Sequence, residues 1–131
     1  MITEDYVSFE VAKLLKEKGF NIQCWMYYSP DTFGPKMFHT QRKGNSQLIP
    51  EWEECVCPTI QLAMKWLRET QNLFVFPFPQ MNANKFWVEI YQLSDNKEWE
   101  NLYCESIDLK DYPLYEQACE AGIKYCLENL I

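Results

Sequence analysis

The chain has 131 residues, a length that fits one folded domain and lets roughly two-thirds of the unfolded surface be buried without disulfide or metal staples. Hydrophobic residues make up 47% of it and charged residues 24%, which is the composition of a globular protein and excludes a disordered tail. Residues 1–50 hold six Lys/Arg and five Asp/Glu (+1), and residues 51–131 hold six and fourteen (−8), so the basic footprint of a nucleic-acid-binding protein is missing.

The N-terminus carries Glu4 and Asp5 where a secretory signal would be basic, and no apolar run has the length of a signal-peptide core or a membrane span. We therefore expect a cytoplasmic protein that does not enter a membrane. In that compartment the six cysteines would be reduced thiols.

The N-terminal third reads as a helix followed by a hairpin. Ser8 is a suitable N-cap, and Gly19 is a suitable stop, with Phe20 placed to contact Leu15. The aromatic run 22–28 predicts a strand, the Pro/Gly-rich segment 29–35 predicts a turn, and residues 36–40 predict the returning strand. The polar segment 41–46 marks an internal boundary, and residues 48–56 predict a short extended piece.

Two amphipathic helices bracket a strand-rich segment in the rest of the chain. The first begins near Pro58, ends near Asn72 and has the apolar stripe Thr59, Leu62, Ala63, Trp66, Leu67 and Thr70. The second has the stripe Tyr115, Ala118, Cys119, Gly122, Ile123, Cys126, Leu127 and Leu130. Between them, residues 73–79 predict either an edge strand or a strand that leaves the sheet at Pro77. Residues 85–93 predict an alternating strand and residues 99–104 a third strand.

These elements predict a single α+β domain over residues 1–131, with sub-parts 1–46 (helix plus hairpin) and 47–131 (an αβββα unit). The apolar stripes are one face wide, so both helices of the αβββα unit should pack on one face of a mainly antiparallel sheet. Gly122 lies within a buried stripe and should mark a close approach of its helix to a neighbour.

The sequence offers few residues with catalytic or metal-binding patterns. His39 is the only histidine, and a thiol-dependent enzyme would pair it with Cys57 or Cys55. A zinc site on Cys55-Val56-Cys57 would have to recruit Cys24, His39 and Cys104 from distant segments. We therefore predict no catalytic residue, no metal and no cofactor, and keep the thiol enzyme as the alternative.

The aromatic residues are the remaining lead. Alternation in the strands must send some rings to the face that the helices do not cover, where a patch of them would form a partner surface. Its predicted members are Trp25, Tyr27, Trp87, Tyr91 and Trp99. The alternative interpretation is that the N-terminal third covers these rings as core.

The acidic residues of the second part also have two interpretations. They keep an aromatic-rich protein soluble, or they form a decoy for the basic surface of nucleic-acid-binding proteins. A decoy requires the carboxylates to gather on one face, with Glu51, Glu53, Glu54, Glu98 and Glu100 as its members.

Three sets of residues carry a resemblance: 7–20, the group 58–59, 63 and 65–69, and the group 115–118, 120–123 and 127. They resemble a family of small uncharacterised proteins of Bacteroides-type gut bacteria, their phages and mobile elements. The resemblance spans nearly the whole chain and implies a genomic setting, with no known activity or site residues. Together with the missing catalytic pattern, it leads us to expect a non-enzymatic accessory protein that binds another protein, without direct contact to nucleic acid.

Overall fold

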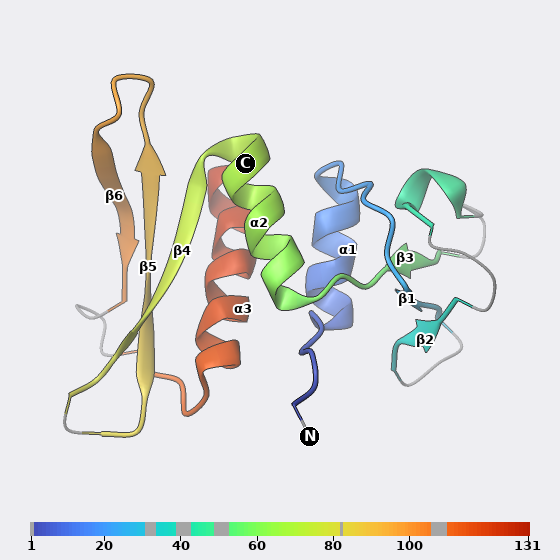
Figure 1. Ribbon diagram of the computed structural model, residues 1–131, viewed down its shortest axis with the longest axis horizontal. Coiled ribbons are helices and arrows are strands. Elements are labelled where there is room, and N and C mark those ends of the chain that lie inside the picture. The colour runs from blue at the N-terminus through green and yellow to red at the C-terminus, as the bar shows by residue number, and fades with distance from the viewer. Residues whose placement is uncertain (1, 31–33, 39–42, 49–52, 82, 106–109) are drawn as a thin grey trace. The chain divides into compact units, whose positions relative to one another are not determined.

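The computed structural model of the protein describes residues 2–30, 34–38, 43–48, 53–81, 83–105 and 110–131 (Figure 1). The described residues form three α-helices and two antiparallel three-stranded sheets, which confirms the α+β class. The chain divides into two compact units, Met1–Thr59 and Ile60–Ile131. We describe each unit by itself.

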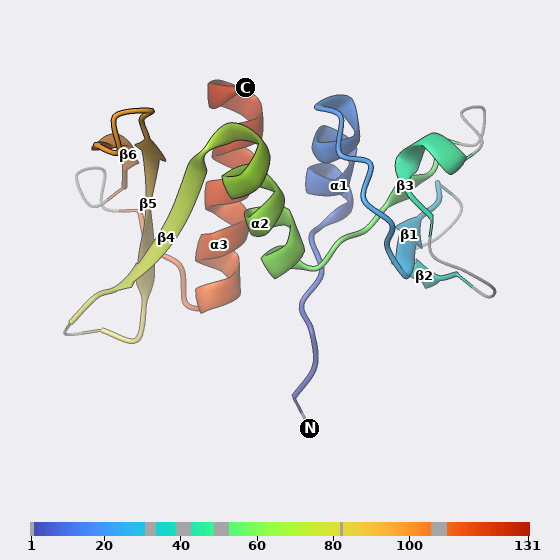
Figure 2. The same ribbon diagram turned by 45° about the horizontal axis from the view of Figure 1, so that its top comes forward.

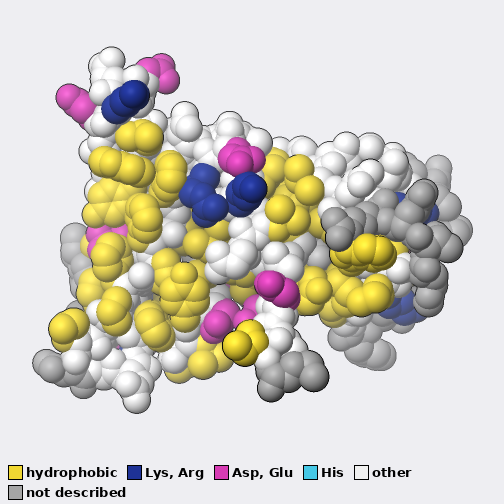
Figure 3. Space-filling model, viewed as in Figure 1, with side chains coloured by type: hydrophobic (Ala, Val, Ile, Leu, Met, Phe, Trp, Pro, Cys, Tyr) yellow, Lys and Arg dark blue, Asp and Glu magenta, His cyan; other side chains and the backbone are white. Residues whose placement is uncertain are grey.

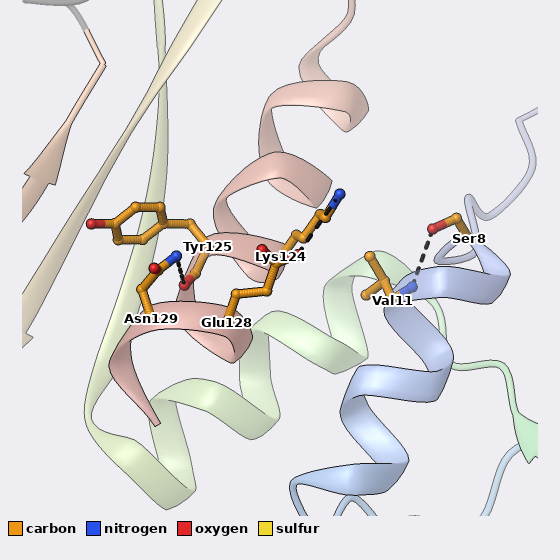
Figure 4. Close-up of polar contacts among 6 residues, drawn as sticks. All are labelled: Ser8, Val11, Lys124, Tyr125, Glu128 and Asn129. Atoms are coloured by element: carbon orange, nitrogen blue, oxygen red, sulfur yellow. Dashed lines mark hydrogen bonds and ion pairs between the residues drawn. The ribbon is translucent and has the colours of Figure 1, made fainter.

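The helix of the N-terminal unit has the predicted ends. α1 spans Phe9–Glu17, and the Ser8 hydroxyl accepts a hydrogen bond from the Val11 amide at 3.3 Å (Figure 4). Gly19 follows with φ +95°, a conformation that favours glycine. The Phe20 amide donates to the Leu15 carbonyl at 2.9 Å, and both side chains are buried, so the predicted stop is confirmed.

The sheet of the N-terminal unit has the order β2-β1-β3 and very short strands: β1 (Met26–Tyr28), β2 (Lys36–Met37) and β3 (Cys55–Val56). β1 and β2 form the predicted antiparallel hairpin, although β1 is shorter than the predicted strand 22–28. β3 comes from the segment predicted to be extended, and it pairs with the other edge of β1.

Side chains order the irregular backbone between these strands. The Asn45 amide group, in a 3₁₀ turn at Asn45–Gln47, donates to the Phe20 carbonyl at 2.6 Å and accepts from the Val56 amide at 2.9 Å. The Tyr28 hydroxyl donates to the Val7 carbonyl at 2.7 Å. These bonds replace ladder bonds that such short strands cannot supply.

The division between the units lies after Thr59, not in the segment 41–46 that the sequence marked. The reason is long-range pairing: β3 joins the N-terminal sheet, and the Val7 amide donates to the Pro58 carbonyl at 3.1 Å. Residues 53–59 thus belong with the N-terminal unit. The assignment of the whole chain to one domain stays a prediction.

The C-terminal unit has the predicted αβββα order. Its elements are α2 (Ile60–Gln71), β4 (Leu73–Pro79), β5 (Phe86–Leu93), β6 (Trp99–Cys104) and α3 (Tyr115–Tyr125), which continues as a π-helical turn at Cys126–Leu130. The antiparallel sheet order is β4-β5-β6, so β4, which contains Pro77 and Pro79, is an edge strand as predicted.

Both helices of this unit lie on the same side of its sheet, in agreement with the prediction (Figures 1 and 2). The core between them is formed from both layers: Leu73, Val75, Val88 and Ile90 of the sheet and Ala118, Cys119, Ile123, Cys126 and Leu127 of the last helical segment are buried. A Cβ atom on Gly122 would collide with Val75 Cγ1 and lie 2.9 Å from Val88 Cγ2. The predicted close approach of this glycine is therefore to the sheet.

Polar contacts complete the C-terminal unit. On the surface of its last helical segment, Lys124 pairs with Glu128 at 3.8 Å and the Asn129 side chain donates to the Tyr125 carbonyl at 3.2 Å (Figure 4). Glu105 is buried, with 2% of the residue exposed. Its carboxylate accepts one hydrogen bond from the Val88 amide and another from the Tyr112 hydroxyl at 2.9 Å. Within the described ranges, no helix is long and apolar enough to cross a membrane.

Candidate functional site

The sheet of the C-terminal unit has two chemically different faces. One face packs on α2 and α3, and the opposite face carries aromatic side chains from all three strands: three from β4, two from β5 and one from β6. We call this second surface the outer aromatic face; its rings are Phe74, Phe76, Phe78, Trp87, Tyr91 and Trp99. In the strand register Phe74 lies opposite Tyr91 and Phe78 lies opposite Trp87.

The rings of the outer aromatic face contact one another. Phe76 meets Tyr91 edge-on at 5.7 Å between centroids, and Trp99 meets Phe74 edge-on at 4.9 Å. Phe78 and Trp87, which lie directly opposite each other in the register, form a separate stacked pair at 5.7 Å. Aromatic contacts of these kinds stabilise a sheet without requiring a cover.

The outer aromatic face is accessible. Trp99 is 53% exposed and Phe76 is 37% exposed, while the other four rings are half-buried against each other. Figure 3 shows hydrophobic side chains gathered over the strands of this unit. Six aromatic rings on one sheet face, four in mutual contact and two in a separate stacked pair, are unusual for a protein face that contacts only water.

One carboxylate lies among these rings. Glu89 is on β5 between Trp87 and Tyr91 and is paired in register with Phe76. Its Oε2 accepts from the Trp87 indole N–H at 3.2 Å, and its Oε1 accepts from the Tyr91 hydroxyl at 3.0 Å and from the Asn101 side-chain amide at 3.4 Å. The hydrogen bond to Glu89 raises the pKa of Tyr91 because it favours the protonated phenol.

The predicted partner-surface residues are divided between the two units. Trp87, Tyr91 and Trp99 share the outer aromatic face, whereas Trp25 and Tyr27 belong to the N-terminal unit. There Trp25 is 45% exposed and Tyr27 stacks on Phe38 at 4.4 Å.

Sequence reasoning missed half of the rings on this face. Phe74, Phe76 and Phe78 alternate with Leu73, Val75 and Pro77, and that period of two was readable from the sequence. The position of Glu89 on β5 was also predictable. Its hydrogen-bond partner Asn101 was not, because it comes from another strand through a register that shifts between Ile90 and Tyr91.

The thiols proposed for an enzyme are buried. Cys55 is 1% exposed and Cys57 is fully buried, and the Cys57 thiol donates to the Val7 carbonyl at 3.4 Å. Burial raises the pKa of Cys55 to about 11, against a smaller lowering by Lys16 and Lys13. A buried thiol that stays protonated at neutral pH is a poor nucleophile. The most accessible cysteine is Cys104, which is half-buried.

The other predicted chemistry has no assembled site. His39 lies outside the described residues, so its proposed pairing with Cys55 or Cys57 stays a prediction. Among the residues that the structure describes, no three His, Cys, Asp or Glu side chains gather as metal ligands.

A hollow of about 630 Å³ opens in the N-terminal unit. Its lining mixes charged and apolar side chains: Phe9, Lys13, Lys16, Glu17, Pro30, Glu53 and Cys55. The Lys16 ammonium already donates to the Glu54 carbonyl at 2.7 Å. Because residues 31–33 and 49–52, which adjoin this lining in sequence, lie outside the described ranges, we assign no ligand to it.

The carboxylates of the decoy hypothesis do not belong to one unit. Glu53 and Glu54 are in the N-terminal unit, Glu98 and Glu100 are in the C-terminal unit, and Glu51 is outside the described residues. Within the C-terminal unit, Glu100 is the register partner of Gln92, which places it on the opposite side of the sheet from the outer aromatic face. The decoy stays a prediction.

No protein-family model matches the chain, and no curated protein and no solved structure matches it significantly. The resemblance to the family of Bacteroides-type bacteria and their mobile elements stays a prediction. The basis for a function is therefore the fold and the chemistry of the outer aromatic face.

Proposed function

We propose that the protein is a non-enzymatic accessory factor that binds a partner protein through the outer aromatic face of its C-terminal unit. The observation that carries this proposal is the set of six rings, a cluster of four and a stacked pair, on the face opposite the helices. Aromatic side chains supply large contact area at low entropy cost and are enriched at the centres of protein interfaces.

The charge of the chain supports a protein partner over a nucleic acid. Stacked aromatic rings on a sheet also bind single-stranded nucleic acids, but those surfaces combine the rings with a basic groove for the phosphates. The outer aromatic face carries the carboxylate of Glu89 at its centre, and the whole chain has a formal charge of −7. Phosphates would be repelled from it.

The setting we propose is the bacterial cytoplasm, in a gene carried by a phage or mobile element. The resemblance of residues 7–20 and of the two helical segments supports this setting. Partner binding by the aromatic face requires no cofactor.

Capture of the partner by matched variants tests the proposal. The wild-type chain, a Phe76→Ser/Trp99→Ser variant and a Met81→Ser control would each be immobilised and exposed to a lysate of the source organism. Met81 is 90% exposed and lies in the turn after β4, outside the outer aromatic face. We expect a protein that the wild type and the control retain and that the double variant loses.

Protection of Cys104 supplies a second measurement. Cys104 pairs in register with Glu89, so a partner on the outer aromatic face should slow its alkylation. A captured protein that the double variant still binds, and that leaves Cys104 alkylation unchanged, would show that the interface lies elsewhere. Binding that weakens with salt but not with the double substitution would favour the acidic decoy.

A further inference from the structure

We infer that the outer aromatic face receives a cationic side chain, an arginine, from an otherwise apolar segment of its partner, and that this side chain pairs with Glu89. The inference rests on the proposed function and specifies the chemistry of the partner. The charged side chain that the structure describes within the ring cluster is Glu89.

Glu89 has hydrogen-bond donors but no counterion among the described residues. Its three donors, from Trp87, Tyr91 and Asn101, are neutral groups. The ion pairs in the described part of the C-terminal unit join Lys65 to Glu69, Lys85 to Asp111 and Lys124 to Glu128, and none includes Glu89. A carboxylate that is fixed among aromatic rings without a cation is a ready site for a cation from outside.

The acceptor capacity of Glu89 leaves room for a further donor. An ionised carboxylate has about four lone-pair sites. The structure fills two on Oε1 and one on Oε2, so Oε2 can accept another N–H without losing a bond. The three neutral donors hold the carboxylate in place before a partner arrives, which reduces the entropy cost of binding.

The rings around Glu89 favour a guanidinium group. Phe76 is directly opposite Glu89 in the register, and Trp87 and Tyr91 flank it two residues away on the same face. The negative face of an aromatic ring attracts a cation, and the planar guanidinium group also stacks on rings in a way that an ammonium group does not. The exposed ring of Trp99 adds apolar area for the neighbouring residues of the partner segment.

The negative charge of the C-terminal unit also favours a cationic partner. Residues 60–131 contain eleven Asp/Glu and six Lys/Arg, which leaves a formal charge of −5 and steers basic partners toward this unit. The same charge argues against a second copy of the chain as the occupant, because two outer aromatic faces in contact would bring two carboxylates of Glu89 together without a cation.

Two blocked tripeptides, acetyl-Leu-Arg-Leu-amide and acetyl-Leu-citrulline-Leu-amide, are the probes for the test. Citrulline keeps the planar shape of arginine and removes its charge. Each probe would be titrated into the full ¹⁵N-labelled chain, with the indole N–H signal of Trp87 as the reporter, because that group contacts Glu89. We expect saturable shifts with the arginine peptide and about tenfold weaker binding of the citrulline peptide, the difference typical of one charge-assisted contact.

Two charge-matched variants identify the carboxylate. Glu89→Gln keeps the shape of the side chain and should make the two peptides bind equally, whereas Glu100→Gln removes the same charge on the opposite side of the sheet and should leave the tenfold preference intact. Equal binding of both peptides by the wild type would overturn the inference, and this comparison does not depend on either variant folding.

The remaining outcomes separate this inference from the proposed function. Shifts of the Trp87 signal with cellotriose and not with the arginine peptide would overturn it in favour of a sugar ligand. Sedimentation as a dimer that Phe76→Ser/Trp99→Ser dissociates would overturn it in favour of a second copy. If a partner captured through the outer aromatic face binds wild type and Glu89→Gln equally, the inference fails while the proposed function stands.

Discussion

The two units order their backbones in different ways. The strands of the N-terminal unit have three, two and two residues, and single side chains such as Asn45 and Tyr28 tie its loops together. The strands of the C-terminal unit have seven, eight and six residues, and its ladder is continuous apart from one register shift. The backbone of the N-terminal unit is ordered by individual polar contacts, and that of the C-terminal unit by the repeating ladder of its sheet.

This difference bears on where a binding surface can form. A long ladder satisfies its own backbone groups, and two helices on one face supply the core, so the opposite face is available for another use. In the N-terminal unit the aromatic side chains are used locally: Phe9 meets Tyr28 edge-on at 5.4 Å and Tyr27 stacks on Phe38.

The tight packing of the C-terminal unit should make Gly122 its most sensitive position. Gly122→Leu would place a side chain where even a Cβ atom would collide with Val75, and the branched Val75 and Val88 side chains are too short to move aside. We expect the free energy of unfolding to fall by about 3 kcal/mol, measured by urea unfolding with tryptophan fluorescence. Gly34→Ala, where a Cβ atom meets nothing within 4 Å, is the control. Equal stability of Gly122→Leu and wild type would refute this packing.

The N-terminal unit should be most sensitive at a polar side chain. Asn45→Ala removes the group that joins the Phe20 carbonyl to the Val56 amide, so two hydrogen bonds are lost. We expect a loss of about 2 kcal/mol, which is about 1 kcal/mol for each bond. Amide hydrogen exchange should show the loss at Val56 first. Unchanged protection there would mean that the short strands hold without this clamp.

The elements that depend on local periodicity were predictable from the sequence. The alternation of residues 86–91, the close approach of Gly122 and most of each helix stripe follow from spacing along one element. The predicted stripes were wrong at Thr70 and Tyr115, which are exposed, and they omitted Ile60 and Met64, which are buried. The pairing of β3 with β1 was not predictable, because it joins segments about thirty residues apart through two-residue ladders. Hydrogen-bond donors reach the carboxylates of Glu89 and Glu105 from other strands of the sheet. The sequence alone therefore does not distinguish these two carboxylates.

The buried thiols of the C-terminal unit should make its stability fall at alkaline pH. Burial raises the pKa of Cys126 from 9.0 to about 12, so the folded state keeps the proton that the unfolded chain releases. This contribution is complete below pH 9 and is lost as the pH rises toward 12. The expected slope is at most about 1.4 kcal/mol per pH unit.

Two variants assign this slope to its thiol. Cys126→Ala should make the dependence of the unfolding free energy on pH above 9 shallower, even though the smaller side chain lowers stability at every pH. Part of the dependence should remain, because burial also raises the pKa of Cys119, to about 11. Cys104→Ala, at a half-buried position, should keep the wild-type slope. Equal slopes in all three proteins would show that other groups cause the alkaline loss.

The smallest effect is expected on the outer aromatic face, and it separates the two interpretations of its rings. Val88 and Trp99 both belong to the sheet of the C-terminal unit, but Val88 is fully buried under the helices and Trp99 is 53% exposed. Val88→Ala should cost about 2 kcal/mol because it leaves a cavity. Trp99→Ser should cost less than about 1 kcal/mol, the range of one cross-strand contact, although it removes a much larger side chain. Chemical unfolding of the two variants measures both values.

If Trp99→Ser cost as much as Val88→Ala, the ring would be part of the core, and the case for a partner surface would be lost. A small cost would mean that Trp99 contributes little to stability, as expected of a residue whose role is binding.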